Sequence, residues 1–415
     1  MKKIKFIDLF AGAGGLSEGF IREGFSPVAH VEMDCNASNT LKTRTAFHYL
    51  KSIGKQAVYN RYLEGLITRE QLWAAVPSSV IDSVINEEIS EKTINHIFKQ
   101  IDSVLGKERV DVIIGGPPCQ AYSIAGRSRD PKGMKEDSRN FLYKYYVSFL
   151  KRYSPKLFVF ENVPGLLSAK DKDGVRHLDN IKKAINEAGY NLQIPATKFL
   201  NARNFGVLQD RKRVIIIGWK KDLKLQYPVF SKKTSTATTL SDLFADLCKL
   251  KNGEGSNGIT YYCKSASKYL KMAKIRTSDE FTTQHIARPH NNNDLEIYKL
   301  AIQFWKKQKR LNYSELPQHL ITHSNTDSFR DRFRVVDGNG ISHTIVAHIA
   351  KDGHYYIHPD PLQLRSITIR EAARIQSFPD DYFFEGSRSA AFKQIGNAVP
   401  VLMAEGIAKK IKEML

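Results

Sequence analysis

The stretch FIDLFAGAGGLSEGF, residues 6–20, predicts a strand, a glycine-rich turn and a helix in immediate succession. Gly12, Gly14 and Gly15 stand where the expected strand ends, and a backbone without side chains there can approach a bound ligand closely. The spacing does not fit the GxGxxG pattern, so the turn alone is equally compatible with a structural role. Glu32, at the end of the next expected strand, favours an adenosyl cofactor, because its carboxylate could accept hydrogen bonds from both ribose hydroxyls.

Further apolar runs at 110–116, 156–162 and 213–219 alternate with stretches of helical periodicity. Continuous runs of this kind are typical of parallel strands that are buried on both faces. We therefore expect an α/β fold with a mainly parallel sheet in a first domain over residues 1–219. Residues 41–105 interrupt the alternation and are expected to form a helical insertion packed on that domain.

The composition of the chain changes after Trp219. Residues 220–350 hold 21 Lys+Arg against 12 Asp+Glu and are rich in turn-forming residues. The segment 295–310 has the pattern of an amphipathic helix with a basic end. We expect residues 220–364 to form a second, smaller and irregular domain.

The last segment, residues 365–415, again has the patterns of regular helices. Thr368 and Glu371 have the spacing of a capping box, which predicts the start of a helix. Residues 399–415 have the pattern of a terminal amphipathic helix, and we expect the whole segment to return to the first domain.

The chain as a whole is basic. Its 415 residues carry a formal net charge of +20, which suggests a polyanion such as nucleic acid, although many basic proteins bind none. No apolar run has the roughly 18 residues that a membrane span needs, and the polar start lacks the apolar core of a secretory signal. The four cysteines, Cys35, Cys119, Cys248 and Cys263, show no CxxC pair, so no disulfide framework is expected and a reducing cytosol fits.

The segment GGPPCQAYS, residues 115–123, places a cysteine at the end of an expected strand. Two prolines restrict the backbone before Cys119, so the thiol would be presented rigidly. A buried structural cysteine is the ordinary alternative, but the glycines, prolines and polar neighbours fit it poorly. A nucleophilic thiol needs a partner that handles protons. Glu161, in FENVPG, ends another expected strand and could share the pocket, although a lone carboxylate there is usually a solvated charge.

Two arginines and an asparagine are further candidates. Arg211 and Arg213 precede the strand RVIIIGW, where alternating side chains would point both to one face. Paired guanidinium groups suit anionic or carbonyl oxygens, but an ordinary basic segment before a strand would look the same. Asn397, in QIGNAVP before the last helix, could bond a ligand or the backbone.

Taken in order, these motifs resemble those of the bacterial cytosine-5 DNA methyltransferase family. The segments DLFAGAGG, VEMD, GGPPCQAYS, ENVPG, QDRKRV, RSITIREAARIQSFPDDY and QIGNAVP follow one another from residue 6 to about residue 405. The resemblance implies a Rossmann-like enzyme that transfers a methyl group from S-adenosyl-L-methionine to carbon 5 of cytosine in a specific site of double-stranded DNA. It also implies a covalent cysteine intermediate and a cytosine flipped out of the duplex.

The resemblance implies a role for each matched residue. Cys119 matches the nucleophile that bonds carbon 6, and Glu161 matches the residue that bonds ring nitrogen 3 and the exocyclic amine. Arg213 matches the arginine near the base carbonyl, and Arg211 the one that supports the active-site loop and phosphate. The positions implied to bind the cofactor are Asp8, Phe10, Gly12, Gly14, Gly15, Leu16, Glu32, Met33, Pro117, Asn397 and Ala398, with Glu88 and Ile89 where the family has an Asp-Ile pair. The positions implied to contact DNA are Gln120, Ser123, Arg127, Gln209 and Thr344.

The same resemblance sets expectations for the protein's setting. Residues 220–364 correspond to a target-recognition domain, and their basic charge fits phosphate contacts. The expected setting is a monomer in a prokaryotic cytoplasm that protects host DNA from a cognate restriction endonuclease. No metal is expected, and four of the 12 histidines, His343, His348, His354 and His358, lack standard ligand spacing.

Two other functions stay open on the sequence alone. A tRNA cytosine-5 methyltransferase shares the fold, but its smaller recognition domain and its Cys-Phe-Thr segment are not found here. A catalytically inactive DNA-binding homologue is disfavoured because the chain keeps Cys119, Glu161, Arg211 and Arg213.

Overall fold

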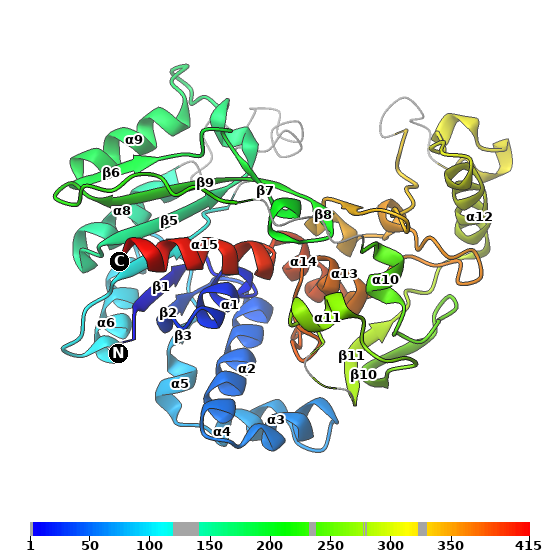
Figure 1. Ribbon diagram of the computed structural model, residues 1–415, viewed down its shortest axis with the longest axis horizontal. Coiled ribbons are helices and arrows are strands. Elements are labelled where there is room, and N and C mark those ends of the chain that lie inside the picture. The colour runs from blue at the N-terminus through cyan, green and yellow to red at the C-terminus, as the bar shows by residue number, and fades with distance from the viewer. Residues whose placement is uncertain (1–2, 119–140, 232–237, 277, 279, 323–329) are drawn as a thin grey trace.

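The computed structural model describes residues 3–118, 141–231, 238–276, 278, 280–322 and 330–415. Its main sheet is parallel from β3 to β5, and the predicted α/β fold with a mainly parallel sheet is confirmed (Figure 1). In spatial order its strands are β3 (Val84–Ile85), β2 (Ser26–Val31), β1 (Lys5–Leu9), β4 (Val112–Gly115), β5 (Leu157–Asn162), β9 (Lys212–Lys220) and β6 (Tyr190–Gln193). Strand β9 is antiparallel to both of its neighbours, and the short β7 (Leu200–Asn201) pairs with its beginning.

Helices cover both faces of this sheet. Because side chains alternate along a strand, Phe6 of β1 packs on one face and Ile7 on the other, and both are fully buried. The Phe6 face carries α1 (Gly15–Arg22) and α15 (Val401–Met414). The Ile7 face carries α6 (Ile94–Leu105), α8 (Leu142–Tyr153) and α9 (His177–Glu187).

The segment 41–105 is mostly helical, but the structure makes part of it integral to the sheet. Its elements are α2 (Cys35–Ser52), α3 (Gln56–Leu63), α4 (Arg69–Ala74), α5 (Ser78–Asp82), β3 and α6. Strand β3 pairs in parallel with β2, and Ile97 and Ile101 of α6 are buried against the sheet. The part that stands outside the sheet is therefore α3 to α5, which packs on α2 around Phe47 and Tyr59.

The chain after Trp219 consists mostly of short elements, and α12 and α15 are its longest helices. The elements are α10 (Leu240–Phe244), β10 (Gly255–Tyr261), α11 (Lys268–Met272), β11 (Phe281–Ile286), α12 (Asn292–Lys306), β12 (Ser342–His343), α13 (Ile369–Ile375), α14 (Arg388–Asn397) and α15. Strand β12 pairs with β8 (Gln209–Asp210), and β10 pairs with β11. Short 3-10 turns are η2 (Pro164–Leu167), η3 (Ala202–Phe205), η4 (Tyr313–Glu315), η5 (Gln318–Leu320), η6 (Ala347–Ala350) and η7 (His354–Tyr356).

The C-terminal segment packs on the main sheet. The predicted capping box is confirmed: the Glu371 amide donates to the Thr368 hydroxyl oxygen, and the Thr368 amide donates to the Glu371 carboxylate. Helix α15 then lies along α1 across the sheet, far from α12 at the opposite end of the molecule (Figure 1).

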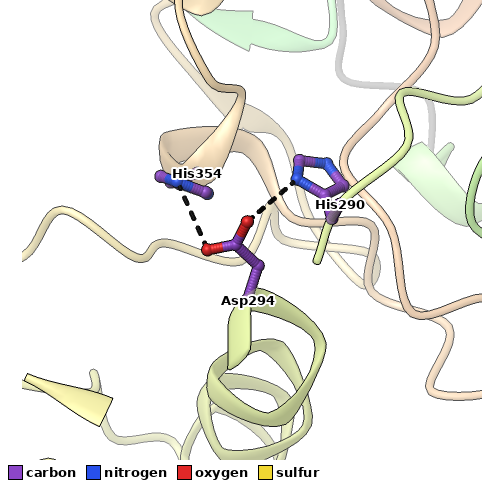
Figure 2. Close-up of side chains that lie close together, drawn as sticks. All are labelled: His290, Asp294 and His354. Carbon is purple, nitrogen blue, oxygen red and sulfur yellow. Dashed lines mark ion pairs between the residues drawn. The ribbon is translucent and has the colours of Figure 1, made fainter. Parts of the chain in front are cut away.

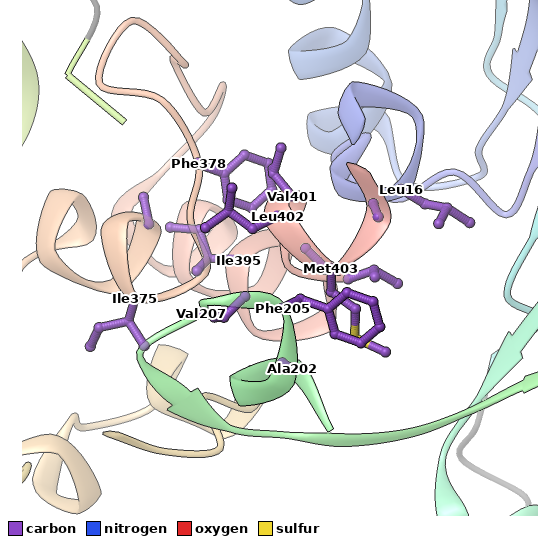
Figure 3. Packing of buried hydrophobic residues seen from close by; sticks show 14 of the residues in the cluster. Leu16, Ala202, Phe205, Val207, Ile375, Phe378, Ile395, Val401, Leu402 and Met403 are labelled. Carbon is purple, nitrogen blue, oxygen red and sulfur yellow. The ribbon is translucent and has the colours of Figure 1, made fainter. Parts of the chain in front are cut away.

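One hydrophobic cluster joins the two regions of the chain. Figure 3 shows Leu16 of α1, Phe205 of η3, Ile375 of α13 and Met403 of α15 converging on it. The same cluster includes Leu243 of α10, so the compositional change after residue 219 does not coincide with a boundary of the core. A separate small core forms around α12, with Tyr298 and Phe333 among its buried members.

The cysteines differ from expectation. Cys248 and Cys263 form a disulfide with a Cα–Cα distance of 5.3 Å, although no disulfide was expected. They stand 15 residues apart, and a backbone hydrogen bond from the Cys263 amide to the Asp246 carbonyl brings their segments together. This proximity comes from the way β10 folds back on the end of α10, which cysteine spacing does not reveal. Cys35 is free and exposed. Across the described ranges, every helix is too short or too polar to cross a membrane.

The close packing of α1 on α15 should depend on Gly19. A Cβ at this position would lie 2.4 Å from the Ala404 Cβ, which is closer than real Cβ contacts. We expect Gly19→Val to lower the thermal unfolding midpoint, because overpacking of this kind costs about 1–3 kcal/mol. Gly258→Val is the control, since the nearest atom to a Cβ there is 3.4 Å away. Equal midpoints for the two variants would contradict this packing.

Candidate active site

The carboxyl ends of β1, β4 and β5 meet at one edge of the sheet. In the parallel registers, Leu9 lies opposite Gly115, and Gly115 lies opposite Phe160. The chain builds outward from β1 through β2 to β3 and then crosses to β4 on the other side of β1. Ligands of open α/β sheets bind in the crevice at such a switch point. The residues directly after Leu9, Gly115 and Phe160 are therefore candidates for a functional site.

Glu161 and Arg213 form an ion pair at this edge. Arg213 Nε, on β9, lies 2.8 Å from Glu161 Oε1, on the neighbouring strand β5. Their side chains are 14% exposed for Glu161 and 11% exposed for Arg213, so bulk water screens the pair only weakly. The arginine thus fixes one carboxylate oxygen of Glu161.

Two consecutive glycines make room for this carboxylate. A Cβ on Gly116 would lie 2.5 Å from Glu161 Oε2, and a Cβ on Gly115 would lie 2.4 Å from the Leu9 carbonyl oxygen. Any side chain at position 116 would push the Glu161 carboxylate away from the strand end. The sequence marks these glycines only as the end of a strand, because their partners follow from the strand register.

Asn162 is a site residue that the sequence prediction missed. It is 1% exposed, and its Nδ2 donates to the Pro117 carbonyl oxygen at 3.2 Å. Its Oδ1 accepts a hydrogen bond from the Val163 amide at 2.9 Å. Asn162 therefore anchors the backbone two residues before Cys119. Its only sequence signal is its position next to Glu161 at the strand end.

Four predicted residues of this segment, Cys119, Gln120, Ser123 and Arg127, lie outside the described residues. Pro117 is described and buried, and its carbonyl is held by Asn162.

The glycine-rich turn after β1 has an unusual backbone. Phe10 has a φ of +56°, which is strained for a residue with a side chain, and Gly12 and Gly14 have φ of +56° and +78°. A Cβ at Gly12 would meet no heavy atom of the described chain within 4 Å, so space is open beside this turn. Gly15 differs, because a Cβ there would lie 2.3 Å from the Val399 carbonyl oxygen. Gly15 therefore serves the packing of α1.

Glu32 faces this turn from the end of β2. Its Oε2 accepts a hydrogen bond from the Gly12 amide and its Oε1 from the Asp34 amide, both at 2.8 Å. Burial raises the pKa of the Glu32 carboxyl, and the two backbone hydrogen bonds oppose that shift. Asn86, directly after β3, donates to the Glu32 carbonyl oxygen at 2.9 Å. Asn86 is a second residue that sequence reasoning missed.

The remaining predicted cofactor residues occupy different environments. Met33 is 59% exposed at the end of β2, and Glu88 is exposed beyond β3, beside the buried Ile89. Asn397 is exposed at the end of α14, whereas the following Ala398 is buried.

Asp8 and Leu16 both lie inside the protein. Asp8 is 1% exposed between β1 and α1, and burial raises the pKa of its carboxyl. Its Oδ2 has no hydrogen-bond partner among the described residues. The Leu16 side chain belongs to the cluster in Figure 3.

Arg211 does not join Arg213, contrary to the expectation that both face one pocket. Its guanidinium is fully buried and donates to the carbonyl oxygens of Ile345 (2.5 Å), Gly396 (3.1 Å) and Ala398 (2.8 Å). The reason is that β8 and the residues after β12 enclose this segment before β9 begins. Arg211 is therefore a positioning residue that ties β9 to the end of α14.

The prediction that Gln209 contacts DNA is wrong. Its side chain is fully buried, with Nε2 donating to Gln376 Oε1 at 2.9 Å and Oε1 accepting from the Ile345 amide at 2.8 Å. Thr344 is only half-buried, and its hydroxyl donates to the Asp210 carbonyl oxygen at 2.6 Å. Its contact with DNA stays a prediction.

Comparison with known proteins identifies the family of the chain that carries this strand-end site. The family described as C-5 cytosine-specific DNA methylase matches residues 4–60 and 81–413. This chain belongs to that family. It is a DNA cytosine-5 methyltransferase of the bacterial restriction–modification type. The unmatched residues 61–80 fall in α3 to α5, the part of segment 41–105 that stands outside the sheet.

Individual relatives can be aligned with almost the whole chain. The type II methyltransferase M.Bpa9945I of Bacillus paralicheniformis is 40% identical over 99% of this chain and 98% of its own length. M.DdeI of Desulfomicrobium norvegicum is 32% identical over 98% of this chain and 88% of its own. A crystal structure titled as a DNA modification methyltransferase encoded within a prophage (E. coli) matches in fold, with a TM-score of 0.64 and 24% identity over 99% of both chains.

The role of Asn162 can be tested on this methyltransferase. We expect Asn162→Ala to lower the single-turnover rate by on the order of 10²-fold, because the backbone before Cys119 loses its anchor. Affinity for S-adenosyl-L-methionine should change little, since the substitution leaves Glu32 and the glycine-rich turn after β1 unchanged. Asn191→Ala, at an exposed position on β6, is the matched control. A folded Asn162→Ala variant with the wild-type rate would remove Asn162 from the positioning of this loop.

Proposed function

We propose that this enzyme methylates a cytosine flipped out of double-stranded DNA through a covalent bond between Cys119 and carbon 6. The observation that carries the proposal is the Glu161–Arg213 pair beside Gly116. Pro117, two residues before Cys119, is held by Asn162 of the same strand end as Glu161. These contacts support a shared pocket for the thiol and the carboxyl group.

The chemistry explains why a thiol and a carboxyl group are needed together. Carbon 5 of cytosine is a poor nucleophile while the ring is aromatic. The Cys119 thiolate bonds carbon 6, and the electron pair of the 5,6 double bond moves toward carbon 5. Carbon 5 then attacks the methyl group of a sulfonium donor, whose sulfur leaves with the electron pair of the broken carbon–sulfur bond. Loss of the carbon 5 proton to a base and departure of the thiolate restore the double bond.

Glu161 stabilises the electron-rich ring in this scheme. Its protonated carboxyl donates a hydrogen bond to ring nitrogen 3 while the ring gains charge, and its other oxygen accepts from the exocyclic amine. Arg213 holds the carboxyl in orientation through Oε1 and lies near the base carbonyl. Because these groups are preorganised and poorly solvated, their effect on the developing charge is larger than in water.

The edge formed by β1, β2 and β3 suits S-adenosyl-L-methionine. This compound supplies the methyl group as a sulfonium. The Glu32 carboxylate, fixed by the Gly12 and Asp34 amides, keeps lone pairs for the ribose hydroxyls. The strained Phe10 and the open space at Gly12 fit an adenosyl group at the turn.

The wider set of contacts belongs to the same proposal. The cofactor residues are completed by Asp8, Gly14, Gly15, Leu16, Met33, Glu88, Ile89, Pro117, Asn397 and Ala398. Gln120, Ser123, Arg127 and Thr344 contact the DNA near the flipped base.

Residues 220–364 recognise the DNA site, and residues 365–415 return the chain to the catalytic domain. The excess of Lys and Arg after Trp219 supports phosphate binding by this region. The enzyme acts as a monomer in the cytoplasm and protects host DNA from a cognate restriction endonuclease. The names of its type II relatives support the restriction–modification context.

A mechanism-based trap tests the covalent step. Fluorine at carbon 5 cannot leave as a cation, so elimination stops after methyl transfer. We expect a denaturant-resistant adduct between the enzyme and a cognate duplex that contains 5-fluorocytosine, formed only when S-adenosyl-L-methionine is present. Peptide mapping should place the link on Cys119.

Cys119→Ser should abolish the adduct, because a hydroxyl is far less ionised than a thiol at neutral pH. Cys35→Ser is the control, since Cys35 is a free and exposed cysteine that lies outside the proposed mechanism. An adduct on another cysteine, or one that persists in Cys119→Ser, would refute the assignment of the nucleophile.

A further inference from the structure

Two histidines and an aspartate converge in the region after Trp219, apart from the strand-end site. His290 precedes α12, Asp294 lies in its first turn, and His354 begins η7 (Figure 2). Their candidate ligand atoms all lie within 4.8 Å of one another. His354 alone was among the four histidines considered from sequence, because His290 and Asp294 join it only through folding.

The candidate ligand atoms of this cluster are slightly farther apart than ligands bound to one ion. His290 Nδ1 lies 3.8 Å from Asp294 Oδ2, and His354 Nε2 lies 3.7 Å from Asp294 Oδ1. Both distances are too long for hydrogen bonds. Ligand atoms around a tetrahedral zinc ion with bonds of about 2.0–2.1 Å lie roughly 3.4 Å apart. A small inward rotation of the two imidazoles would close the cluster on such an ion.

In each imidazole, the ring nitrogen that is not a candidate ligand also has a hydrogen-bond partner. His290 Nε2 lies 3.0 Å from the Ser366 hydroxyl oxygen, and His354 Nδ1 lies 2.8 Å from the Tyr298 hydroxyl oxygen. Metal-binding histidines characteristically use their second ring nitrogen in this way, which fixes the tautomer and the ring orientation. The other ring nitrogens, His290 Nδ1 and His354 Nε2, face the Asp294 carboxylate, and the Tyr298 hydroxyl oxygen also lies 3.4 Å from His290 Nδ1.

The main chain at His290 is fixed by Asn252. Asn252 accepts a hydrogen bond from the His290 amide and donates one to the His290 carbonyl oxygen. The position of this imidazole is therefore set by the fold.

We propose that His290 Nδ1, Asp294 and His354 Nε2 form a zinc site. Nitrogen ligands suit zinc over magnesium or calcium, and Asp294 supplies the negative charge. The His290 side chain is 3% exposed, whereas Asp294 and His354 are 20% and 21% exposed, so the ion has access from solvent. Water completes the coordination. The bound ion links the start of α12 to η7, two segments that the Tyr298–His354 hydrogen bond and the small α12 core already connect.

The test is zinc binding by the full chain purified without a histidine tag. After treatment with a chelator and dialysis, titration with Zn²⁺ should show one ion bound per chain and a raised thermal unfolding midpoint. Asp294→Asn keeps the shape of the side chain but removes its charge, and we expect it to abolish stoichiometric binding. Tyr298→Phe removes the hydroxyl that bonds His354 Nδ1 and lies 3.4 Å from both ring nitrogens of His290, and it should weaken zinc affinity about 10–100-fold.

His319→Ala is the matched control. His319 pairs with Glu296 of the same helix α12 at 3.4 Å, but both side chains are more than half exposed and lie outside the cluster. Zinc binding should be unchanged in this variant. Less than stoichiometric binding by the wild-type chain would overturn the proposal. So would full zinc affinity in a folded Asp294→Asn variant, or equal losses in His319→Ala and Tyr298→Phe. None of these measurements depends on methyl transfer. A negative result for zinc binding would therefore leave the proposed function untouched, and the reverse also holds.

Discussion

The candidate active site depends on the absence of a side chain at Gly116. Strand β4 ends beside β5 in a register that directs the Glu161 carboxylate at this residue, and even a single carbon there would lie 2.5 Å from Oε2. With glycine in place, Arg213 can hold the carboxylate from β9 and Asn162 can hold Pro117. Sheet register, glycine and ion pair together define one wall of the proposed cytosine pocket.

Buried arginines connect this site to the region that we propose binds DNA. Arg211 bonds the carbonyl oxygens of Ile345 and Ala398, which links the beginning of β9 to both later regions of the chain. Arg374 of α13 is fully buried and pairs with Asp246 after α10 and with Asp380. Buried charges of this kind are costly to separate, so the proposed recognition region and the catalytic sheet are held in a defined relation.

The sequence predicts β1, β2, β4, β5 and β9 because their apolar runs are continuous and end in glycine or polar residues. It does not predict the short strands β3 and β6, which join the same sheet. It does predict Glu161 and Arg213, whose motifs stand directly at strand ends. The sequence does not predict the role of a residue whose partner lies far away in the chain and is brought close only by folding. Gln209 looks like a polar residue available for DNA, yet its amide completes a buried network, and the cysteines of the disulfide meet only through β10. The orienting roles of Asn162 and Asn86 depend on strand register, which no local pattern reveals.

The most direct test of this account is the single-turnover methylation rate of Gly116→Ala. The added methyl group would displace the Glu161 carboxylate, whereas the Glu32 edge and the proposed recognition region would be unchanged. We predict a rate lower by on the order of 10²-fold or more, with affinities for DNA and S-adenosyl-L-methionine close to wild type. Gly258→Ala, where space is available, should keep the wild-type rate. A Gly116→Ala enzyme that methylates as fast as the wild type would contradict the account.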